Sequence, residues 1–391
     1  MTNLPQGWEV KTLSEIGEII TGSTPSKSNV EFYRKDYPFF KPSDFEQGYF
    51  LENAGDNLSK LGFGKARQLP PKTILVVCIG SLGKVALTRV IGSCNQQINA
   101  IIPHKNIISE YIYYYCISSK FQSILFSKAP QTTLAIFNKT EFSKLEIIYP
   151  KDIKEQERIV GILDFAFSKI DENIKKAKEN LANIDELMQS ALQKAFNPLK
   201  DNAKENYKLP QSWEWKSLEE ISENISAGGD KPKNCTESKT AKNQIPVYAN
   251  GVNNNGLVGY TDKATIIKPS LTISARGTIG FVCIRKEPYF PIVRLISLIP
   301  CENILCLHYL YFCLNFFIAK GEGSSIPQLT IPKFKSLQIP LPPLKEQEQI
   351  AEHLDFVFEK AKALKELYTK ELKDYEELKQ SLLNKAFKGE L

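Results

Sequence analysis

A stretch of 44 residues occurs twice in this chain and limits what the chain can fold into. Residues 154–197, KEQERIVGILDFAFSKIDENIKKAKENLANIDELMQSALQKAFN, match residues 345–388, KEQEQIAEHLDFVFEKAKALKELYTKELKDYEELKQSLLNKAFK, at 19 of 44 positions without a gap. Because chance rarely gives this identity over one ungapped block, the sequence indicates an internal duplication.

Each copy predicts a long helix with one narrow apolar seam, since apolar residues recur every three or four positions. Only Gly161 interrupts the pattern before its end. The predicted seam consists of Leu163, Ala166, Ile170, Ile174, Ala177, Leu181, Ile184, Met188, Ala191 and Ala195, and of Ile350, Leu354, Val357, Ala361, Leu364, Tyr368, Leu372, Tyr375, Leu378, Leu382 and Ala386. Such a helix needs a facing seam, which the other copy supplies most simply; two unrelated surface helices are the alternative.

A second repeat extends the duplication to the whole chain. The opening LPQGWEVKTLSEI, Leu4–Ile16, returns from Leu209 as LPQSWEWKSLEEI, so the order is globular part, helix, globular part, helix. We therefore expect an α+β protein with domains at 1–150, 151–197, 198–342 and 343–391. The interiors of the two globular parts differ strongly, which indicates one scaffold with two different surfaces.

The globular parts alternate short β-type runs with turn signals. Thr73–Thr88 predicts two strands joined at Gly80–Gly83, and Leu271–Ile284 repeats this pattern. We expect a helix over Glu110–Phe126 and a last strand over Phe142–Tyr149. Asp152 is then expected to cap the first long helix, with Glu155 in the capping-box position.

Composition describes an ordinary protein of 391 residues, with 42% apolar and 24% charged residues. The net charge of +6 is compatible with nucleic-acid binding without requiring it. The eight cysteines form no CxxC pair, which favours reduced, mostly buried thiols in the cytoplasm. The apolar run Ile304–Ala319 is shorter than the roughly 20 residues that a bilayer requires, so we expect a buried helix and no membrane partner.

Known catalytic motifs do not explain the chain. The glycines of Gly80–Val85, GSLGKV, are spaced differently from those of a phosphate-binding loop, and HExxH and GxSxG do not occur. No catalytic residue and no metal ligand set is predicted, which favours a recognition or assembly protein. A nuclease or recombinase with a hidden acidic site, or a coiled-coil tether with protein-binding ends, are the alternatives.

The order and duplication of these motifs resemble the specificity (S) subunits of Type I restriction-modification systems. The resemblance covers essentially the whole chain and is carried by the paired LPQxWE openings, the KEQE motifs at Lys154 and Lys345, and the LDFAF and LDFVF segments. The helix ends QSALQKAF and QSLLNKAF and the hairpins IGSLGKVAL and ARGTIGFVC also belong to the pattern.

This resemblance implies two target recognition domains and an antiparallel pair of long helices, in a non-catalytic subunit that reads double-stranded DNA. It also implies two methylation subunits and two motor-nuclease restriction subunits as partners, with S-adenosylmethionine, ATP and Mg bound by those partners and not by this chain. A two-fold design reads mirrored half-sites about one helical turn apart, roughly 34–36 Å. Because the domain interiors differ, we expect two unlike half-sites, with a spacer set by the helices.

Base reading requires amides, hydroxyls and basic side chains at loop tips or exposed sheet faces. The candidates in the first domain are Lys41, Ser43, Asp44, Ser81, Lys84, Gln96, Gln97, Asn99, Gln131, Thr132 and Thr133. Those in the second domain are Tyr248, Asn250, Asn253, Asn254, Arg276, Thr278, Arg294, Ser324, Ser325 and Gln328. Asn253 and Asn254 are also explained as simple turn residues, since asparagine favours turns. The candidates for binding the methylation subunits are Phe165, Phe167, Phe356 and Phe358, although packing on the adjoining domain also explains them.

Overall fold

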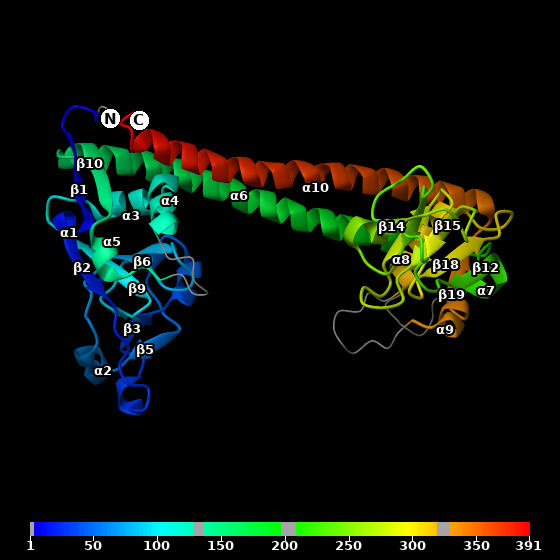
Figure 1. Cartoon of the computed structure of the whole chain (residues 1–391), viewed down its shortest axis with the longest axis horizontal. Coiled ribbons are helices and arrows are strands. Elements are labelled where there is room, and N and C mark those ends of the chain that lie inside the picture. The colour runs from blue at the N-terminus through cyan, green and yellow to red at the C-terminus, as the bar shows by residue number, and fades with distance from the viewer. Residues whose placement is uncertain (1–3, 129–135, 197–208, 319–328) are drawn as a thin grey trace. The chain divides into compact units, whose positions relative to one another are not determined.

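The computed structural model describes residues 4–128, 136–196, 209–318 and 329–391 (Figure 1). The chain divides into two compact units, Met1–Ala177 with Lys370–Leu391, and Lys178–Thr369. Each long helix contributes to both units. The two units are mixtures of helix and sheet, as expected for the α+β class.

The globular part of the first unit is built on a five-stranded sheet in the order β2-β9-β6-β7-β4. A three-stranded sheet, β5-β3-β8, and the pair β1-β10 complete it. The strands are β1 Trp8–Thr12, β2 Gly17–Thr21, β3 Tyr37–Phe40, β4 Phe50–Leu51, β5 Asp56–Leu58, β6 Ile74–Val77, β7 Val85–Thr88, β8 Ser93–Cys94, β9 Ile98–Pro103 and β10 Glu146–Pro150. The helices are α1 Leu13–Ile16, η1 Val30–Phe32, η2 Pro42–Gln47, α2 Lys60–Lys65, α3 Ser109–Ile117, α4 Ser119–Lys128 and α5 Lys139–Ser143.

The globular part of the second unit has a four-stranded sheet, β12-β18-β15-β16, with the smaller sheets β14-β13-β17 and β11-β19. The strands are β11 Glu214–Ser217, β12 Ser222–Ala227, β13 Ile245–Tyr248, β14 Leu257–Thr261, β15 Ser270–Ile273, β16 Val282–Arg285, β17 Phe290–Pro291, β18 Ile296–Pro300 and β19 Gln338–Leu341. The helices are α7 Leu218–Ile221, η3 Asn253–Gly256, α8 Leu307–Phe317 and α9 Ile331–Lys335.

The repeated LPQxWE openings form the same substructure in both units. Each opening strand, β1 or β11, pairs antiparallel with the last strand of its globular part, β10 or β19. Each continues into a one-turn helix whose cap residue, Thr12 or Ser217, bonds the carboxylate of the third helical residue. The repeat therefore closes each globular part next to the start of its long helix.

The two predicted long helices are α6, Ile153–Phe196, with 44 residues, and α10, Leu344–Ala386, with 43 residues. They run antiparallel within each unit. In the first, Leu163 shares a core with Leu383, and further along α6 the Asp171 carboxylate accepts from Lys379. In the second, the last turns of α6 share a core with Leu354, and Asp185 accepts from Lys365.

The predicted seam is confirmed for the first copy, where all ten residues are buried or half-buried. In the second copy Leu364 and Leu378 are 42% and 46% exposed, so both were wrongly assigned to the seam. An α-helix has 3.6 residues per turn, so positions spaced by three or four residues gradually move around the helix surface. This movement explains why two positions were wrongly assigned to the seam.

The third residue of each KEQE motif explains why this motif is repeated. Gln156 and Gln347 are fully buried. Gln156 Oε1 accepts from the Ile108 N–H (3.0 Å), and its Nε2 donates to the Pro150 carbonyl (2.9 Å). Gln347 does the same with the Cys306 N–H (2.9 Å) and the carbonyls of Ile304 and Pro342 (2.9 and 2.8 Å). Each glutamine thus ties the first turn of a long helix to its globular domain.

Replacing Gln347 by leucine is expected to destabilise the second unit by about 3 kcal/mol, because a buried N–H and two carbonyls lose their partner. Chemical unfolding followed by circular dichroism measures the change. The matched control is Gln349→Leu, which alters an exposed position of the same helix and is expected to change stability by about 0.5 kcal/mol or less. Equal effects of the two substitutions would contradict the proposed role of Gln347.

Three local predictions require correction or completion. The helix expected over Glu110–Phe126 is two helices, because buried Ser118 adopts an extended conformation (ψ 146°) and bonds the Tyr115 carbonyl. The strand expected over Phe142–Tyr149 begins only at Glu146, since Asn138 caps the short helix α5. Asp152 does cap α6, accepting from the Lys154 N–H (3.0 Å), while the Glu155 carboxylate pairs with Arg158.

All eight cysteines are free thiols, of which four are buried and four are half-buried. The prediction of mostly buried thiols was therefore too strong. Burial raises the pKa of Cys78 and of Cys94 to about 12, which keeps both as neutral thiols.

Candidate nucleic-acid interface

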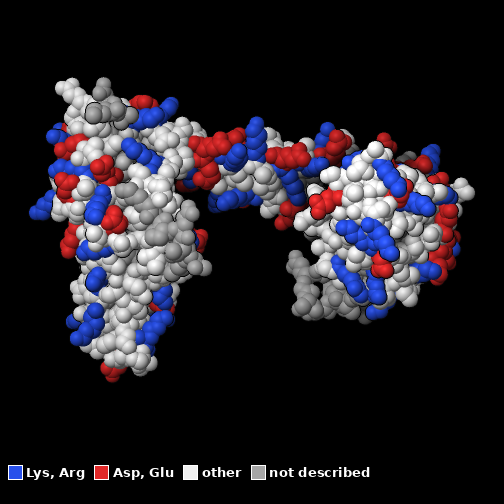
Figure 2. Space-filling view, in the orientation of Figure 1, with Lys and Arg blue, Asp and Glu red and all other residues white. Residues whose placement is uncertain are grey.

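Basic residues are concentrated in particular segments of both globular parts. From Asn57 to Ser109 there are seven lysines and arginines and no acidic residue, and between Lys231 and Arg294 there are ten against three. Figure 2 shows lysine and arginine side chains gathered on the visible face of the second globular part. Such an excess is what a phosphate backbone attracts.

In the first domain, the candidates of the FKPSDF segment differ in their availability. Ser43 is exposed, whereas Asp44 accepts from the backbone N–H groups of Lys41 (2.7 Å) and Gly55 (2.9 Å). The Lys41 ammonium pairs with Asp56, and desolvation lowers its pKa. Asp44 is thus a loop-forming residue, and Ser43 is the member of this segment that faces solvent.

The glycine turn between β6 and β7 presents two candidates. Gly80 and Gly83 have φ of 80° and 88°, which only glycine adopts easily, and Ser81 between them is exposed. Lys84 follows the turn and pairs with Glu46, whose pKa this hydrogen bond lowers. Lys84 is only 38% exposed, so contact with a phosphate would require exchange of this partner.

The candidate amide side chains at and next to the Asn95–Ile98 turn differ in their exposure. Gln96 is exposed, while half-buried Gln97 accepts from the Asn95 side chain (2.8 Å). Asn99 is only 2% exposed and accepts from the Thr21 hydroxyl (2.6 Å). The structure therefore places Asn99 in the core, and the proposed interface does not include it.

Asn250 connects three loops of the second domain. Its Nδ2 donates to the Val293 carbonyl (2.6 Å), and its Oδ1 accepts from the Ala275 N–H (2.8 Å). Ala275 directly precedes the turn that carries Arg276 and Thr278. Both ends of the Asn250 side chain are therefore occupied, which makes it a positioning residue and not a direct reader of bases.

Tyr248 has a similar structural role. The Arg285 guanidinium lies 3.5 Å from the centre of its ring and also donates to Thr272 Oγ1 and to the Asn255 carbonyl. Arg285 is only 8% exposed and was missed by sequence reasoning. Arg285 ends a β-type run, in which side chains alternate between two faces. This pattern does not indicate that its guanidinium stacks on Tyr248.

Five candidates of the second domain remain at exposed turns: Asn253, Asn254, Arg276, Thr278 and Arg294. Asn254 has φ of 47° and Arg294 has φ of 59°, so both lie in left-handed turns. The predicted candidates Gln131, Thr132, Thr133, Ser324, Ser325 and Gln328 lie outside the described residues.

The four candidate partner-binding phenylalanines fall into two pairs. Phe165 and Phe356 are 69% and 59% exposed. Phe167 packs against Tyr114, with ring centres 5.3 Å apart, and Phe358 packs against Phe312 at 5.0 Å. The adjoining domains thus account for Phe167 and Phe358, whereas Phe165 and Phe356 occupy equivalent positions of the duplication and remain exposed.

A second repeated pair of exposed apolar residues lies on the same helices; the sequence pattern had assigned Leu378 to the seam and had not singled out Leu187. Leu187 and Leu378 occupy equivalent positions of the duplication and are 55% and 46% exposed. Of these four repeated residues, each unit contains one phenylalanine and one leucine, which lie on opposite helices. The signal that could have identified them is a leucine retained in both copies at a position outside the predicted seam of the first copy.

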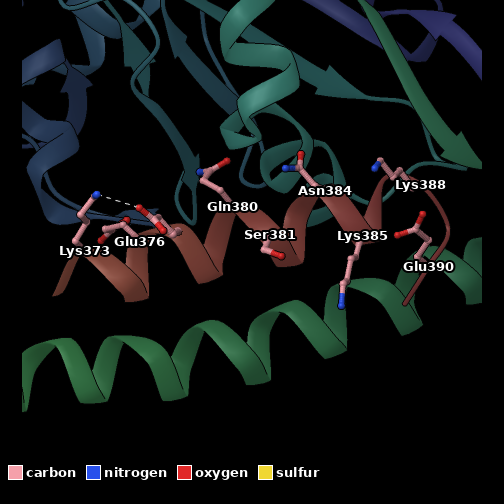
Figure 3. A pocket seen from close by; sticks show the side chains of 9 residues that line it. Lys373, Glu376, Gln380, Ser381, Asn384, Lys385, Lys388 and Glu390 are labelled. Atoms are coloured by element: carbon pink, nitrogen blue, oxygen red, sulfur yellow. Dashed lines mark ion pairs between the residues drawn. The ribbon is translucent and has the colours of Figure 1, made fainter. Parts of the chain in front are cut away.

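The neighbouring face of α10 in the first unit is polar. Figure 3 shows Gln380 and Asn384 pointing toward the helices of the globular domain, while Lys385 points toward α6. Gln380 Oε1 accepts from the Ser119 N–H (2.9 Å), and Asn384 Oδ1 accepts from the Ser119 hydroxyl (3.2 Å). Gln380, Asn384 and Lys385 line a pocket of about 660 Å³. The bonds from Ser119 to Gln380 and Asn384 anchor the α3-α4 junction on the long helix.

The described parts of the chain offer neither a metal site nor a membrane-spanning helix. No group of three or more His, Cys, Asp or Glu residues is placed there to hold a metal ion. None of the helices described is long and apolar enough to cross a membrane.

Comparison with known proteins identifies the family. The family described as Type I restriction modification DNA specificity domain matches residues 5–183 and 210–373. The Type I restriction enzyme HindI specificity subunit of Haemophilus influenzae is 39% identical over 176 residues, which cover 44% of this chain and 38% of that protein. The MjaIX specificity subunit of Methanocaldococcus jannaschii is 24% identical over 392 residues, covering 91% and 88%.

Solved structures share the fold. A chain solved in work on complex assembly and conformational transition of the type I R-M system has a TM-score of 0.82 and 19% identity, covering 100% of both chains. The HsdS subunit of Thermoanaerobacter tengcongensis has a TM-score of 0.60 and 20% identity, covering 99% and 98%. Because the family match extends over both halves of the duplication, this chain belongs to the Type I restriction-modification DNA specificity family, whose members are non-catalytic DNA-recognition subunits.

Proposed function

We propose that this chain reads one double-stranded DNA target through two unlike half-sites, one for each globular domain. The main support for this proposal is that one duplicated framework presents different side chains at corresponding turns. The turn between β8 and β9 carries Gln96 and Gln97, whereas the turn between β17 and β18 carries Val293 and Arg294. The basic segments described above support phosphate contacts on both domains.

The long helices are proposed to set the number of unread base pairs and to bind two methylation subunits. Two restriction subunits would join the assembly for cleavage. S-adenosylmethionine, ATP and Mg would be bound by these partners. This part of the proposal rests on the exposed apolar pairs that the duplication repeats on α6 and α10. The proposed domains remain 1–150, 151–197, 198–342 and 343–391.

The function is tested by mapping methylated bases in cells that contain this chain and its partner subunits. The expected result is one bipartite motif with two different halves, which disappears when the gene for this chain is removed. A coiled-coil tether would instead shift no DNA from a random pool, with or without the methylation subunit. Metal-dependent cleavage by the purified chain alone would favour a nuclease.

Arg276 is the residue expected to contribute most to base discrimination in the second domain. It lies exposed on the glycine turn between β15 and β16, and a bidentate contact with guanine is worth about 1–3 kcal/mol. Arg276→Ala should therefore relax one base position of the methylated motif. The control Arg276→Lys keeps the charge but not the bidentate geometry, so it should relax the same position. If lysine restores full discrimination, or alanine weakens all sequences equally, Arg276 contacts phosphate.

A further inference from the structure

Two turns of the second domain each place two successive residues in the left-handed region. In one turn these are Asn254 and Asn255, with φ of 47° and 53°. In the other they are Val293 and Arg294, with φ of 54° and 59°. Asparagine adopts this region at low cost, whereas a β-branched residue is strongly disfavoured there. The Val293 turn therefore retains strain that the Asn254 turn avoids.

The strained turn is held by hydrogen bonds to the surrounding loops. The N–H groups of Val293 and Arg294 donate to the carbonyls of Gly229 and Gly228, both at 2.8 Å. The Asn250 side chain donates to the Val293 carbonyl at 2.6 Å. A Cβ atom on Gly228 would lie 2.5 Å from the Pro291 carbonyl carbon, so the backbone can approach this closely only at glycine. The surroundings impose the turn and keep it rigid.

The Val293 side chain gains little from this arrangement, because it is 51% exposed. Backbone strain that is not offset by burial of the side chain is found at binding sites, where a rigid backbone holds a side chain in position for its ligand. Val293 also stands beside exposed Arg294 and on a loop that Asn250 joins to the Arg276 turn. Val293 thus presents an apolar side chain at a loop tip, with polar and basic side chains on the neighbouring loop tips. This arrangement matches the major-groove edge of thymine, where a C5-methyl group lies next to a hydrogen-bond acceptor.

We propose that Val293 contacts the C5-methyl group of a thymine in the half-site read by the second domain. This inference rests on the proposed function and adds a specificity-determining residue that was not among the candidates. The corresponding turn of the first domain carries Gln96, a polar residue, which agrees with unlike half-sites. Val293 supplies only van der Waals contact, and Arg294 is placed to supply the neighbouring polar or charged contact.

The test uses the complex of this chain with its methylation subunits and duplexes that contain the mapped target. Each thymine of the target is replaced in turn by deoxyuridine, which removes only the methyl group. For the wild-type chain, replacement of one thymine is expected to weaken binding about fourfold, the effect of one buried methyl-sized group. With Val293→Asn, which accepts the left-handed conformation, the same replacement should have no effect.

The controls separate the possible failures. Val30→Asn, at a valine that is 79% exposed on the first domain, should retain the wild-type response to every deoxyuridine. Val293→Asn should raise the thermal midpoint, since it relieves strain, and a lower midpoint would show that Val293 serves the fold. Equal deoxyuridine effects in wild type and Val293→Asn, or a target without thymine, overturn the inference while specific binding persists. Absence of specific binding to the unsubstituted duplex overturns the proposed function as well.

Discussion

Replacing Phe165 and Phe356 together by glutamate is expected to abolish docking of the methylation subunits while the chain stays folded. Both rings are more than half exposed, so their removal costs little in the free chain. At an interface, a buried aromatic anchor contributes about 2 kcal/mol or more, and a glutamate in its place adds an unpaired charge. Each site should therefore lose affinity by a factor of about 30 or more. Light scattering of the co-purified complex measures the stoichiometry.

The duplication makes the single variants informative. Phe165→Glu alone should leave one methylation subunit bound, and Phe356→Glu alone should do the same, because the two positions are equivalent. The matched control is Phe167→Leu with Phe358→Leu. These rings pack on Tyr114 and on Phe312 of their own domains, so this variant should lower stability and retain both partners. Retention of two subunits by the double glutamate variant would contradict docking at these rings.

Leu187 and Leu378 are expected to extend the same surfaces. Leu187 lines a groove of about 630 Å³ in the second unit. Its other apolar lining residues are Ala191, Ala195, Ile350 and Val357, and its polar ones are Ser190, Lys194, Glu346, Gln349 and His353. A groove of mixed apolar and polar lining beside an exposed leucine is suited to an amphipathic helix. We therefore infer that the docking surface of each unit includes residues from both α6 and α10.

Periodic features of this molecule could be predicted from the sequence, because periodicity is a local property of the chain. The seam through Leu163 and Ile170 follows from the helical period alone, and both side chains are buried. The short strands β6 and β7 follow from two β-type runs around a glycine turn. The break at Ser118 was missed, because residues on both sides of it continue the apolar character of one helix.

Roles that depend on contacts between distant segments could not be predicted from the sequence. Asn99 and Asn250 have the residue type that reads bases, yet both are held by internal hydrogen bonds across 78 and 43 positions of the chain. Arg285 and Val293 are the converse case, because the sequence did not single out either residue. Neither the stacking of the Arg285 guanidinium nor the left-handed conformation of Val293 has a sequence signal. Residue type identifies candidates at loops, and the fold decides which of them face solvent.

Lengthening both long helices by one turn is expected to increase the spacer of the DNA target by about two base pairs. Four residues add about 6 Å to a helix, and base pairs are stacked about 3.4 Å apart. The insertions belong after Ala177 in α6 and after Thr369 in α10, where one unit passes into the other. Inserting in both helices preserves the pairing of their seams within each unit. Mapping of methylated bases measures the new spacer.

The same experiment distinguishes a helical ruler from a flexible connection. Both half-sites should stay unchanged, because the inserted residues lie in neither globular domain. Insertion of seven residues in each helix, which preserves the phase of the seam better, should add about 10 Å or about three base pairs. The control is the same four residues placed after Leu391, which leaves both helices at their original length and should leave the spacer unchanged. A flexible connection would accept several spacers at once, so an unchanged or mixed spacer in the lengthened variants would contradict control of the spacing by α6 and α10.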